Sequence, residues 1–365
     1  MIRARGFSMV ELMVAITLAL VVTTGVISIF IGSRSAYNST SGTAELTDGG
    51  RFALNFIATS VRGAGNMTCT TAPLVQGILN PGATALTTSW TQALGGFEAV
   101  NTNGGPGYAV APAIPPVRVA ADGNNTDWVG GLDGALSNLV VQNNDVLVVR
   151  STLANAVPAY VQTIADGTNS FTVYGPAAAP PTLAANQMVV ISDCSKGVIF
   201  QITNAGLGAN PTITHNGGGG SPGNSISAFP LSFAPGSLVA PVDTLAYYIG
   251  VGNDGDGALF VYSSNAKGNW QPTELVPDIE AMQILYGLDT NNTQTVSNYV
   301  TADQVVDFNS VMSVKVALLA ASAPGAGRPS TAVSYNLLGT TVTPPVDSRS
   351  RQVFEATIAV RNSLH

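Results

Sequence analysis

The residues with the most distinctive chemistry near the start of the chain are Gly6, Phe7 and Glu11. Glu11 places a lone carboxylate just before twenty uncharged residues, 12–31, with the sequence LMVAITLALVVTTGVISIFI. A carboxylate at membrane depth costs roughly 2.5 to 3.5 kcal/mol, so a partner normally neutralises it. No Lys, Arg or His lies between Phe7 and Ser33, and the nearest cation would be an α-amino group created by cutting after Gly6. The amine of a neighbouring subunit would serve equally well.

Catalytic chemistry finds little support in the sequence. His215 and His365 are the only histidines, one just before a glycine-rich stretch and the other at the last position. Nucleophile-elbow, zinc-hydrolase and P-loop motifs are absent, and the carboxylates form no evident acid and base pair. The stretch 217–223 superficially resembles a phosphate-binding loop, but no Lys follows it. We therefore expect a non-enzymatic protein with no cofactor, no metal and no small-molecule substrate.

Two turns rich in Asp and Asn, 252–257 and 289–293, carry the hard oxygen ligands that calcium prefers. Neither turn fits an EF-hand. With Gly257 at the sixth position of that loop, the first and twelfth positions fall on Gly252 and Ser263, which supply no carboxylate. We expect hairpin turns built from residues that tolerate positive φ, with a calcium site of another kind as the alternative.

Cys69 and Cys194 are the only cysteines, and neither lies in the apolar segment. An even pair in an extracytoplasmic domain is most simply interpreted as one disulfide. The alternative is two buried free thiols. No C-x-x-C spacing occurs, so a dithiol redox centre or a zinc ribbon is not indicated.

The distribution of charge predicts both topology and partners. Arg3 and Arg5 precede the apolar run, which places the N-terminus in the cytoplasm and everything beyond about Gly32 outside it. The net charge is −7, and it becomes −9 if Arg3 and Arg5 are removed. Nucleic-acid binding is disfavoured because the chain has no basic patch to displace counterions from phosphates.

A long helix must position Glu11 and the apolar run. No Pro occurs from Phe7 to Ala72, so we expect the helix to continue to about Arg62, with softening at its glycines, 42, 49 and 50. Its second half is amphipathic, with polar residues on one face and small or apolar residues on the other. The apolar face comprises Leu46, Gly50, Ala53, Ile57 and Val61.

Strand patterns dominate the rest of the chain. The expected strands are 170–174, 187–192, 198–203, 244–251, 258–263, 280–288, 311–320 and 353–360, with a hairpin formed by 139–141 and 146–149 around Asn143-Asn144. Because strands follow one helix without βαβ alternation, the predicted fold class is α+β, a long helix packed on an antiparallel β-sheet head with long loops. The predicted divisions are a leader (1–6), a transmembrane half-helix (7–32), an amphipathic half-helix (33–63) and a β-rich globular head (64–365).

The stretch RGFSMVEL at 5–12, followed by the apolar run, closely resembles the class III signal of type IV pilins and type II secretion pseudopilins. The resemblance implies that a prepilin peptidase cuts after Gly6, that Phe7 becomes the N-methylated first residue, and that Glu11 docks the subunit in a filament. A simple membrane anchor would explain the length of the run but not the Gly-Phe junction. A cleaved secretory signal would have a shorter apolar core of 7–15 residues.

Three C-terminal blocks resemble those of PilW-type minor pilins. They are IEAMQILYGLD (279–289), VMSVKVALL (311–319) and FEATIAVRN (354–362). Asp193-Cys194 followed by 198–200 also resembles a block of that family, which supports a bond between Cys69 and Cys194. The regions 70–140 and 205–240 carry no matching motif.

The resemblance implies a non-catalytic minor pilin that takes part in initiation and assembly of a type IV pilus, in a complex at the tip. Its implied partners are other minor pilins, the major pilin, the prepilin peptidase and the inner membrane. The head would be periplasmic before assembly and extracellular afterwards. The alternatives are a J-type minor pseudopilin of type II secretion and a pilus-associated adhesin, which could use an aromatic patch of Tyr247, Tyr248, Tyr262, Trp270 and Tyr286.

Overall fold

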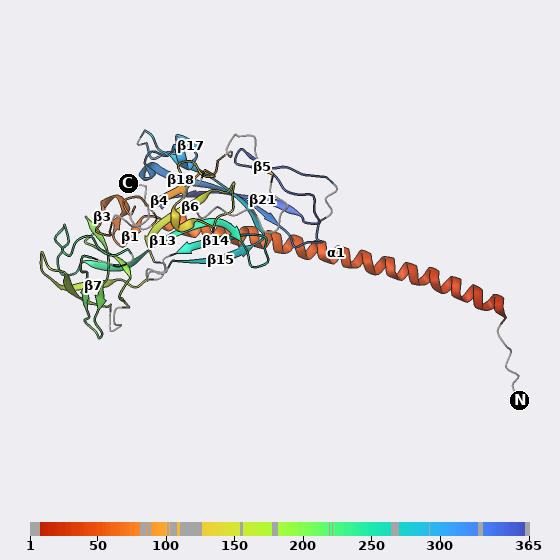
Figure 1. The fold of residues 1–365 in the computed structure, drawn as a ribbon, viewed down its shortest axis with the longest axis horizontal. Helices are drawn as coiled ribbons and strands as arrows, with labels where there is room; N and C mark the ends of the chain where they lie inside the picture. The colour runs from red at the N-terminus through yellow and green to blue at the C-terminus, as the bar shows by residue number, and fades with distance from the viewer. Residues whose placement is uncertain are drawn as a thin grey trace, which may run out of the picture.

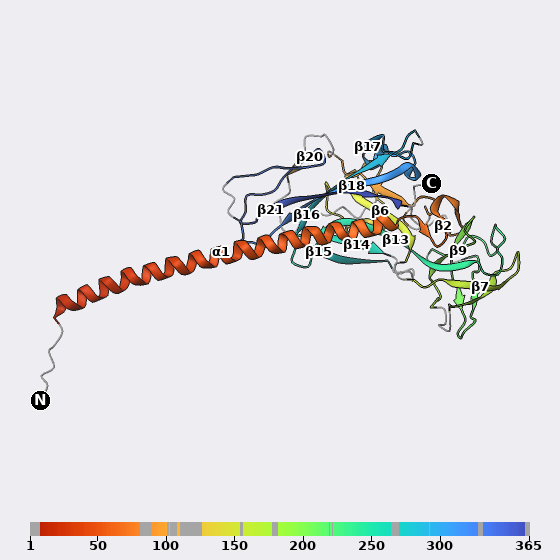
Figure 2. The same ribbon diagram turned by 180° about the vertical axis from the view of Figure 1, so that it is seen from behind.

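One helix dominates the long dimension of the molecule. The computed structural model describes residues 8–80, 86, 89–100, 102, 108–109, 126–153, 156–176, 182–218, 220, 222–263, 270–291, 293–327 and 331–361. The helix α1 (Met9–Gly63) has 55 residues, which corresponds to about 80 Å at the usual rise per residue. Its N-terminal half projects from the head, and its C-terminal half lies along the β-sheets (Figures 1 and 2).

The predicted apolar face of α1 is confirmed. Its buried residues include all five of the expected positions, Leu46, Gly50, Ala53, Ile57 and Val61. The helix runs without interruption through its glycines, so the expected softening is not seen. Gly42 and Gly50 instead mark close contacts, because an added Cβ would collide with Ala326 and Phe354, respectively.

The described residues of the head form a large sheet and three smaller ones. The twelve-stranded sheet contains β3 (Val75–Gly77), β4 (Leu94–Phe97), β6 (Val146–Thr152), β7 (Ala159–Ile164), β8 (Ser170–Tyr174), β9 (Met188–Ser192), β10 (Gly197–Gln201), β11 (Asn204–Ala205), β12 (Thr212–Thr214), β13 (Leu238–Val251), β14 (Gly257–Ser263) and β15 (Gln271–Pro277). The four-stranded sheet, called here the C-terminal sheet, has the order β17 (Asn298–Val300), β16 (Ile279–Leu288), β18 (Val311–Ala321), β21 (Arg351–Ala359).

The remaining elements are short. They are the strands β1 (Asn66–Met67), β2 (Thr70–Thr71), β5 (Tyr108–Ala109), β19 (Tyr335–Leu337) and β20 (Thr340–Thr343), and the 3-10 helices η1 (Ala72–Leu74), η2 (Gly134–Leu136), η3 (Ala302–Gln304) and η4 (Phe308–Ser310). One long helix followed by mainly antiparallel strands confirms the predicted α+β class.

The strand β13 joins two parts of the large sheet. Its first residues pair with β9 and β7, and its later residues pair with β6 and β14. The part built from β7 to β12 lies beyond the C-terminal end of α1, at the opposite end of the molecule from the start of α1 (Figure 1). It has a hydrophobic core of its own, whereas the core around α1 is shared with the C-terminal sheet.

The predicted hairpin around Asn143-Asn144 is wrong. β6 pairs with β4 and β13, and residues 139–141 form no strand beside it. Asn144 and Asp145 instead bond to the backbone of β16. The side-chain oxygen Oδ1 of Asn144 accepts the Met282 N–H at 2.8 Å, and Asp145 Oδ2 accepts the Ile284 N–H at 2.7 Å. These side chains therefore link β6 to the C-terminal sheet in place of a turn.

Candidate assembly interface

The start of α1 is held by two residues of the predicted signal. Ser8 is the N-cap and forms a capping box with Glu11. The Ser8 N–H donates to Glu11 Oε2 at 3.0 Å, and Ser8 Oγ accepts the Val10 N–H at 3.2 Å. Gly6 and Phe7 lie outside the described residues, so the geometry of the predicted cleavage junction is not on view.

The part of α1 that follows Glu11 is apolar and has no contact with the head. The helix is long and apolar enough to cross a membrane, with a mean hydropathy of 2.5 over its best 18-residue window and no burial there. Its hydroxyl groups bond within the helix, as in Thr23 Oγ1 to Ala19 O and Thr24 Oγ1 to Leu20 O, both at 2.7 Å. Since these groups need no outside partner, the helix suits lipid or the apolar surface of another helix.

The head packs against the second half of α1 through strands near the C-terminal end of the chain. Phe354 and Ile358 of β21 and several residues of β18 share one hydrophobic core with the helix. Ser60 and Tyr247 add a hydrogen bond of 2.7 Å between their hydroxyl groups. The second half of α1 and the C-terminal sheet therefore share one hydrophobic core.

Cys69 and Cys194 form the expected disulfide. Cys69 follows closely after α1, and Cys194 lies in the turn between β9 and β10. The bond closes a separation of 125 residues. It ties the distal part of the head to the region where the helix ends.

Two buried carboxylates lie behind the C-terminal sheet. Glu98 and Asp145 are 5% and 2% exposed, respectively. Asp145 Oδ1 accepts the Ala99 N–H at 3.0 Å, while Glu98 Oε1 accepts the hydroxyl of Thr102 at 2.9 Å. Burial raises the pKa of Glu98 to about 7, with a smaller contribution from the nearby charge of Asp303. Burial also raises the pKa of Asp145 well above its usual value, and the charge of Glu98 adds to that rise. This arrangement favours protonated, neutral carboxyl groups rather than an exposed acid–base pair.

The histidine His215 lies in an aromatic core. It is 1% exposed, and its ring stacks on Phe229 with the ring centroids 3.9 Å apart and an interplanar angle of 10°. Its Nδ1 is buried without a hydrogen-bond partner. Burial lowers the pKa of His215 to about 4. The side chain is therefore a neutral core group at physiological pH.

The Asp-rich turn at 252–257 contributes to an acidic cluster. Among the described residues, Asp254, Asp256 and Asp278 are close enough together to hold a metal ion. A protein cation is already there, since the Arg349 guanidinium pairs with Asp256 and, at 2.9 Å, with Asp278. In the second predicted turn, 289–293, the Asp289 carboxylate accepts hydrogen bonds from backbone N–H groups of its own loop.

The predicted aromatic patch is mostly interior. Tyr247, Tyr248 and Tyr286 are buried, while Tyr262 and Trp270 stack on each other with their ring centroids 5.2 Å apart and remain partly exposed. The five side chains therefore do not present one adhesive surface.

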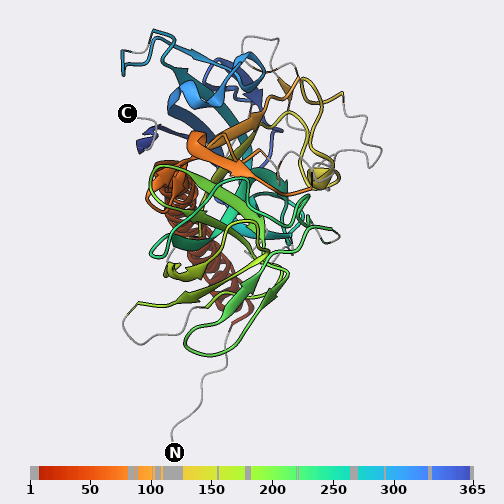
Figure 3. The same cartoon turned by 90° about the vertical axis from the view of Figure 1, so that its left-hand side faces the viewer.

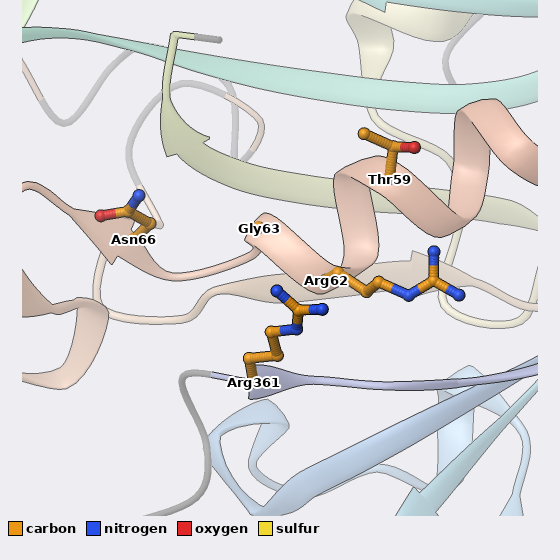
Figure 4. A pocket seen from close by; sticks show the side chains of 5 residues that line it. All are labelled: Thr59, Arg62, Gly63, Asn66 and Arg361. Atoms are coloured by element: carbon orange, nitrogen blue, oxygen red, sulfur yellow. The ribbon is translucent and has the colours of Figure 1, made fainter. Parts of the chain in front are cut away.

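An open hollow of about 440 Å³ lies where α1 ends, beside the end of β21. Thr59, Arg62, Gly63, Asn66 and Arg361 line it. Figure 4 shows both arginine side chains on the side of the helix end that faces β21. Sequence reasoning missed this hollow, because Arg62 and Arg361 are 299 positions apart and neither belongs to a motif.

Comparison with known families matches both ends of the chain. Residues 1–27 match the prokaryotic N-terminal methylation motif, and residues 246–362 match the type IV pilus-assembly protein W, PilW. The two ends of the chain are therefore similar to those of PilW-type minor pilins with a class III signal. Searches of curated proteins and of solved structures found no match.

The two matches support the role of a type IV pilus minor pilin, anchored in a membrane before assembly. The PilW-type region contains β15, β18 and β21, the strands that pack most extensively on α1. The methylation motif contains Ser8, Glu11 and most of the uncovered apolar helix. The family assignment suggests a structural, non-enzymatic protein, and it implies association with other pilus components.

Proposed function

We propose that this protein is a non-catalytic minor pilin that helps to initiate type IV pilus assembly within a minor-pilin complex at the pilus tip. The single observation that carries the proposal is the uncovered apolar half of α1 with one carboxylate, Glu11, at its start. Before assembly, lipid covers this segment and the head is periplasmic. In the pilus, the helices of other minor pilins and of the major pilin replace the lipid, and the head is extracellular.

The assembly route begins at the N-terminus. The prepilin peptidase cuts after Gly6, and the new amine of Phe7 is N-methylated. The Glu11 carboxylate then forms an ion pair with the N-terminal amine of a neighbouring subunit in the apolar interior of the filament. Charge neutralisation there is favourable because an isolated carboxylate is costly in such surroundings.

The capping box gives Glu11 a local role before docking. Among the described residues, its carboxylate accepts one hydrogen bond, from Ser8 N–H, and remains at the exposed start of the helix. A carboxylate accepts several hydrogen bonds at once. Glu11 can therefore keep the helix start ordered and still accept a neighbour's amine.

The size of the head supports a tip position. The described residues of the proposed head, 64–365, extend to the side of α1 (Figure 3) and beyond its C-terminal end (Figure 1). The head of a tip subunit has few neighbouring subunits, whereas the head of a repeating shaft subunit must pack against the heads of other subunits on every side.

The test compares Glu11→Ala with Glu45→Ala in the full-length protein. Both residues are exposed carboxylates of α1, but Glu45 lies on the half that bears the head. We expect Glu11→Ala to be processed normally, yet to lower pilus number and recovery of partner pilins, whereas Glu45→Ala retains both. Unchanged pilus number and normal recovery of partner pilins for Glu11→Ala would contradict the docking role.

A further inference from the structure

The C-terminal sheet has one long open edge. β21 pairs with β18 on one side, and no described strand pairs with its other side. The strand has nine residues and shows no bulge in its pairing with β18. An edge of this kind presents a row of backbone groups that can pair with another chain.

The backbone groups on the open edge can be identified. Val360 N donates to Met312 O, and Ser322 N donates to Ser350 O. The even-numbered residues of this segment therefore point their backbone groups toward β18. Since hydrogen-bonding direction alternates along an antiparallel strand, the odd-numbered residues direct their N–H and C=O groups outward. They are Arg351, Val353, Glu355, Thr357 and Ala359.

Most of the features that usually protect such edges are missing from β21, whose charged side chains are Arg351, paired with Glu280 and Asp347, and Glu355. Soluble proteins shorten edge strands, bulge them, or place Pro and Lys on them. The opposite edge strand of the same sheet, β17, has only three residues. β21 is three times as long and contains neither Pro nor Lys. Glu355 and Thr357, near the middle of the strand, are exposed.

The flank of α1 beside this edge is basic. An added side chain at Gly49 would face Val276 of β15, and one at Gly50 would meet Phe354 of β21. Each residue turns about 100° around a helix, so Arg51 lies on the flank beyond β21. Arg62 follows eleven residues later, about three turns, on the same flank. Arg361 comes two residues after the end of β21 and lines the hollow with Arg62.

These three arginines form no ion pair with the described residues of the head. None of its ion pairs includes Arg51, Arg62 or Arg361. Arg349 and Arg351, in contrast, are held by acidic neighbours. In a chain with a net charge of −7, a row of available arginines along an open strand edge indicates an acidic partner.

We propose that the outer edge of β21, with Arg51, Arg62 and Arg361 beside it, is a docking groove for an extended, acidic strand from the head of a different pilin subunit. Main-chain pairing would supply affinity, and the arginines would select for carboxylates. The hollow between Arg62 and Arg361 receives one carboxylate at the end of the added strand. The inference rests on the proposed function, because it takes the partner to be a subunit of the same pilus.

The main test removes one outward N–H group. Thr357→Pro deletes the Thr357 donor while leaving the even-numbered bonds to β18 in place, and Thr357→Ala is the matched control that keeps the donor. Full-length variants are expressed in the pilus-forming host, and co-purified pilins are quantified by mass spectrometry. We expect Thr357→Pro to lower recovery of one partner pilin about tenfold, and Thr357→Ala to change it less than about twofold. Recovery with Thr357→Pro equal to that with Thr357→Ala would overturn the proposal.

Misfolding of the Thr357→Pro variant would be revealed by loss of the Cys69–Cys194 bond on a non-reducing gel. In that case a charge variant tests the proposal instead. Arg62→Glu with Arg361→Glu alters exposed side chains only, and Lys196→Glu on the distal part of the head is its control. We expect about a tenfold loss of the same partner for the double variant alone. Retention of the partner by the double variant would overturn the proposal.

The occupant is identified by photocrosslinking. A benzoylphenylalanine at position 357 should crosslink to an acidic strand of another pilin, whereas the same group at Leu207, which is 99% exposed, should not. A crosslink to a second copy of this chain, or none to any pilin, would overturn the assignment. If Glu11→Ala loses its partners while Thr357→Pro and the arginine variant retain them, only the groove is wrong. If none of these variants loses partners, the proposed function fails as well.

Discussion

The ring of Phe354 on β21 occupies the space that a side chain at Gly50 of α1 would need. At Gly49, one residue earlier, an added Cβ would make an ordinary contact with Val276 Cγ1 at 3.6 Å. The two adjacent glycines of α1 thus differ in the space available for a side chain. Gly50 is required for contact between the helix and the C-terminal sheet, whereas Gly49 is not.

Alanine at these two positions should act in opposite directions. Gly50→Ala should destabilise the protein by roughly 1 to 3 kcal/mol, because overpacking outweighs the helix propensity gained. Gly49→Ala should be neutral or stabilising by up to about 1 kcal/mol, since alanine is the better helix former. Denaturant unfolding of the full-length protein in detergent, followed by fluorescence, measures both. Equal effects of the two substitutions would show that the contact with Phe354 is unimportant.

The contribution of Glu98 to stability should fall as the pH rises from the unfolded-state pKa of this group to its folded-state pKa. Burial raises the pKa of Glu98 from 4.5 to about 7, so the folded state binds this proton more tightly than the unfolded state. The stabilisation is complete below about pH 4.5 and is lost as the pH approaches 7, for a total of about 3 kcal/mol. The raised pKa of Asp145 acts in the same direction.

Thermal unfolding of wild type and Glu98→Gln between pH 5 and pH 8 tests this effect. The variant should lose less stability over that range, while Glu355→Gln, an exposed carboxylate on β21, should behave as wild type. Identical pH profiles for wild type and Glu98→Gln would contradict the assignment to Glu98.

His215 should limit stability on the acid side. Burial lowers the pKa of His215 from 6.5 to about 4, so the unfolded state gains the proton first as the pH falls. The His215 term is absent above about pH 6.5 and destabilises the fold increasingly toward pH 4, by about 3 kcal/mol in total, so it opposes the Glu98 term where the two ranges overlap. His215→Phe should keep the stacking on Phe229 and reduce the decline. A slope between pH 6.5 and pH 4.5 that is unchanged in the variant would rule out His215 as its source.

Local periodicity was sufficient to predict the helix and many of the longer strands, although β7 and β15 were not predicted. Leu46, Ala53, Ile57 and Val61 recur at helical spacing, and the structure buries all of them. The strand predicted at 170–174 coincides with β8, and the other predicted strands agree with observed ones within a few residues, apart from 139–141 and the start of β13. The paired cysteines were equally informative, since the disulfide is present.

Features that depend on contacts between distant segments were not predictable. The start of β13 was missed because Pro241 removes a backbone donor and normally argues against a strand, yet it pairs there with Val189. Asn144 was assigned to a turn by composition, although its side chain bonds to β16. The hollow at Arg62 and Arg361 exists only because β21 returns to the end of α1.

The most direct test of the central claim is mass spectrometry of the mature N-terminus, using full-length protein from pilus-forming cells. The proposal that this chain is processed and assembled as a pilin predicts a first residue of Phe7 carrying one N-methyl group, with the six residues through Gly6 removed. An unmethylated N-terminus at any position other than Phe7 would contradict it.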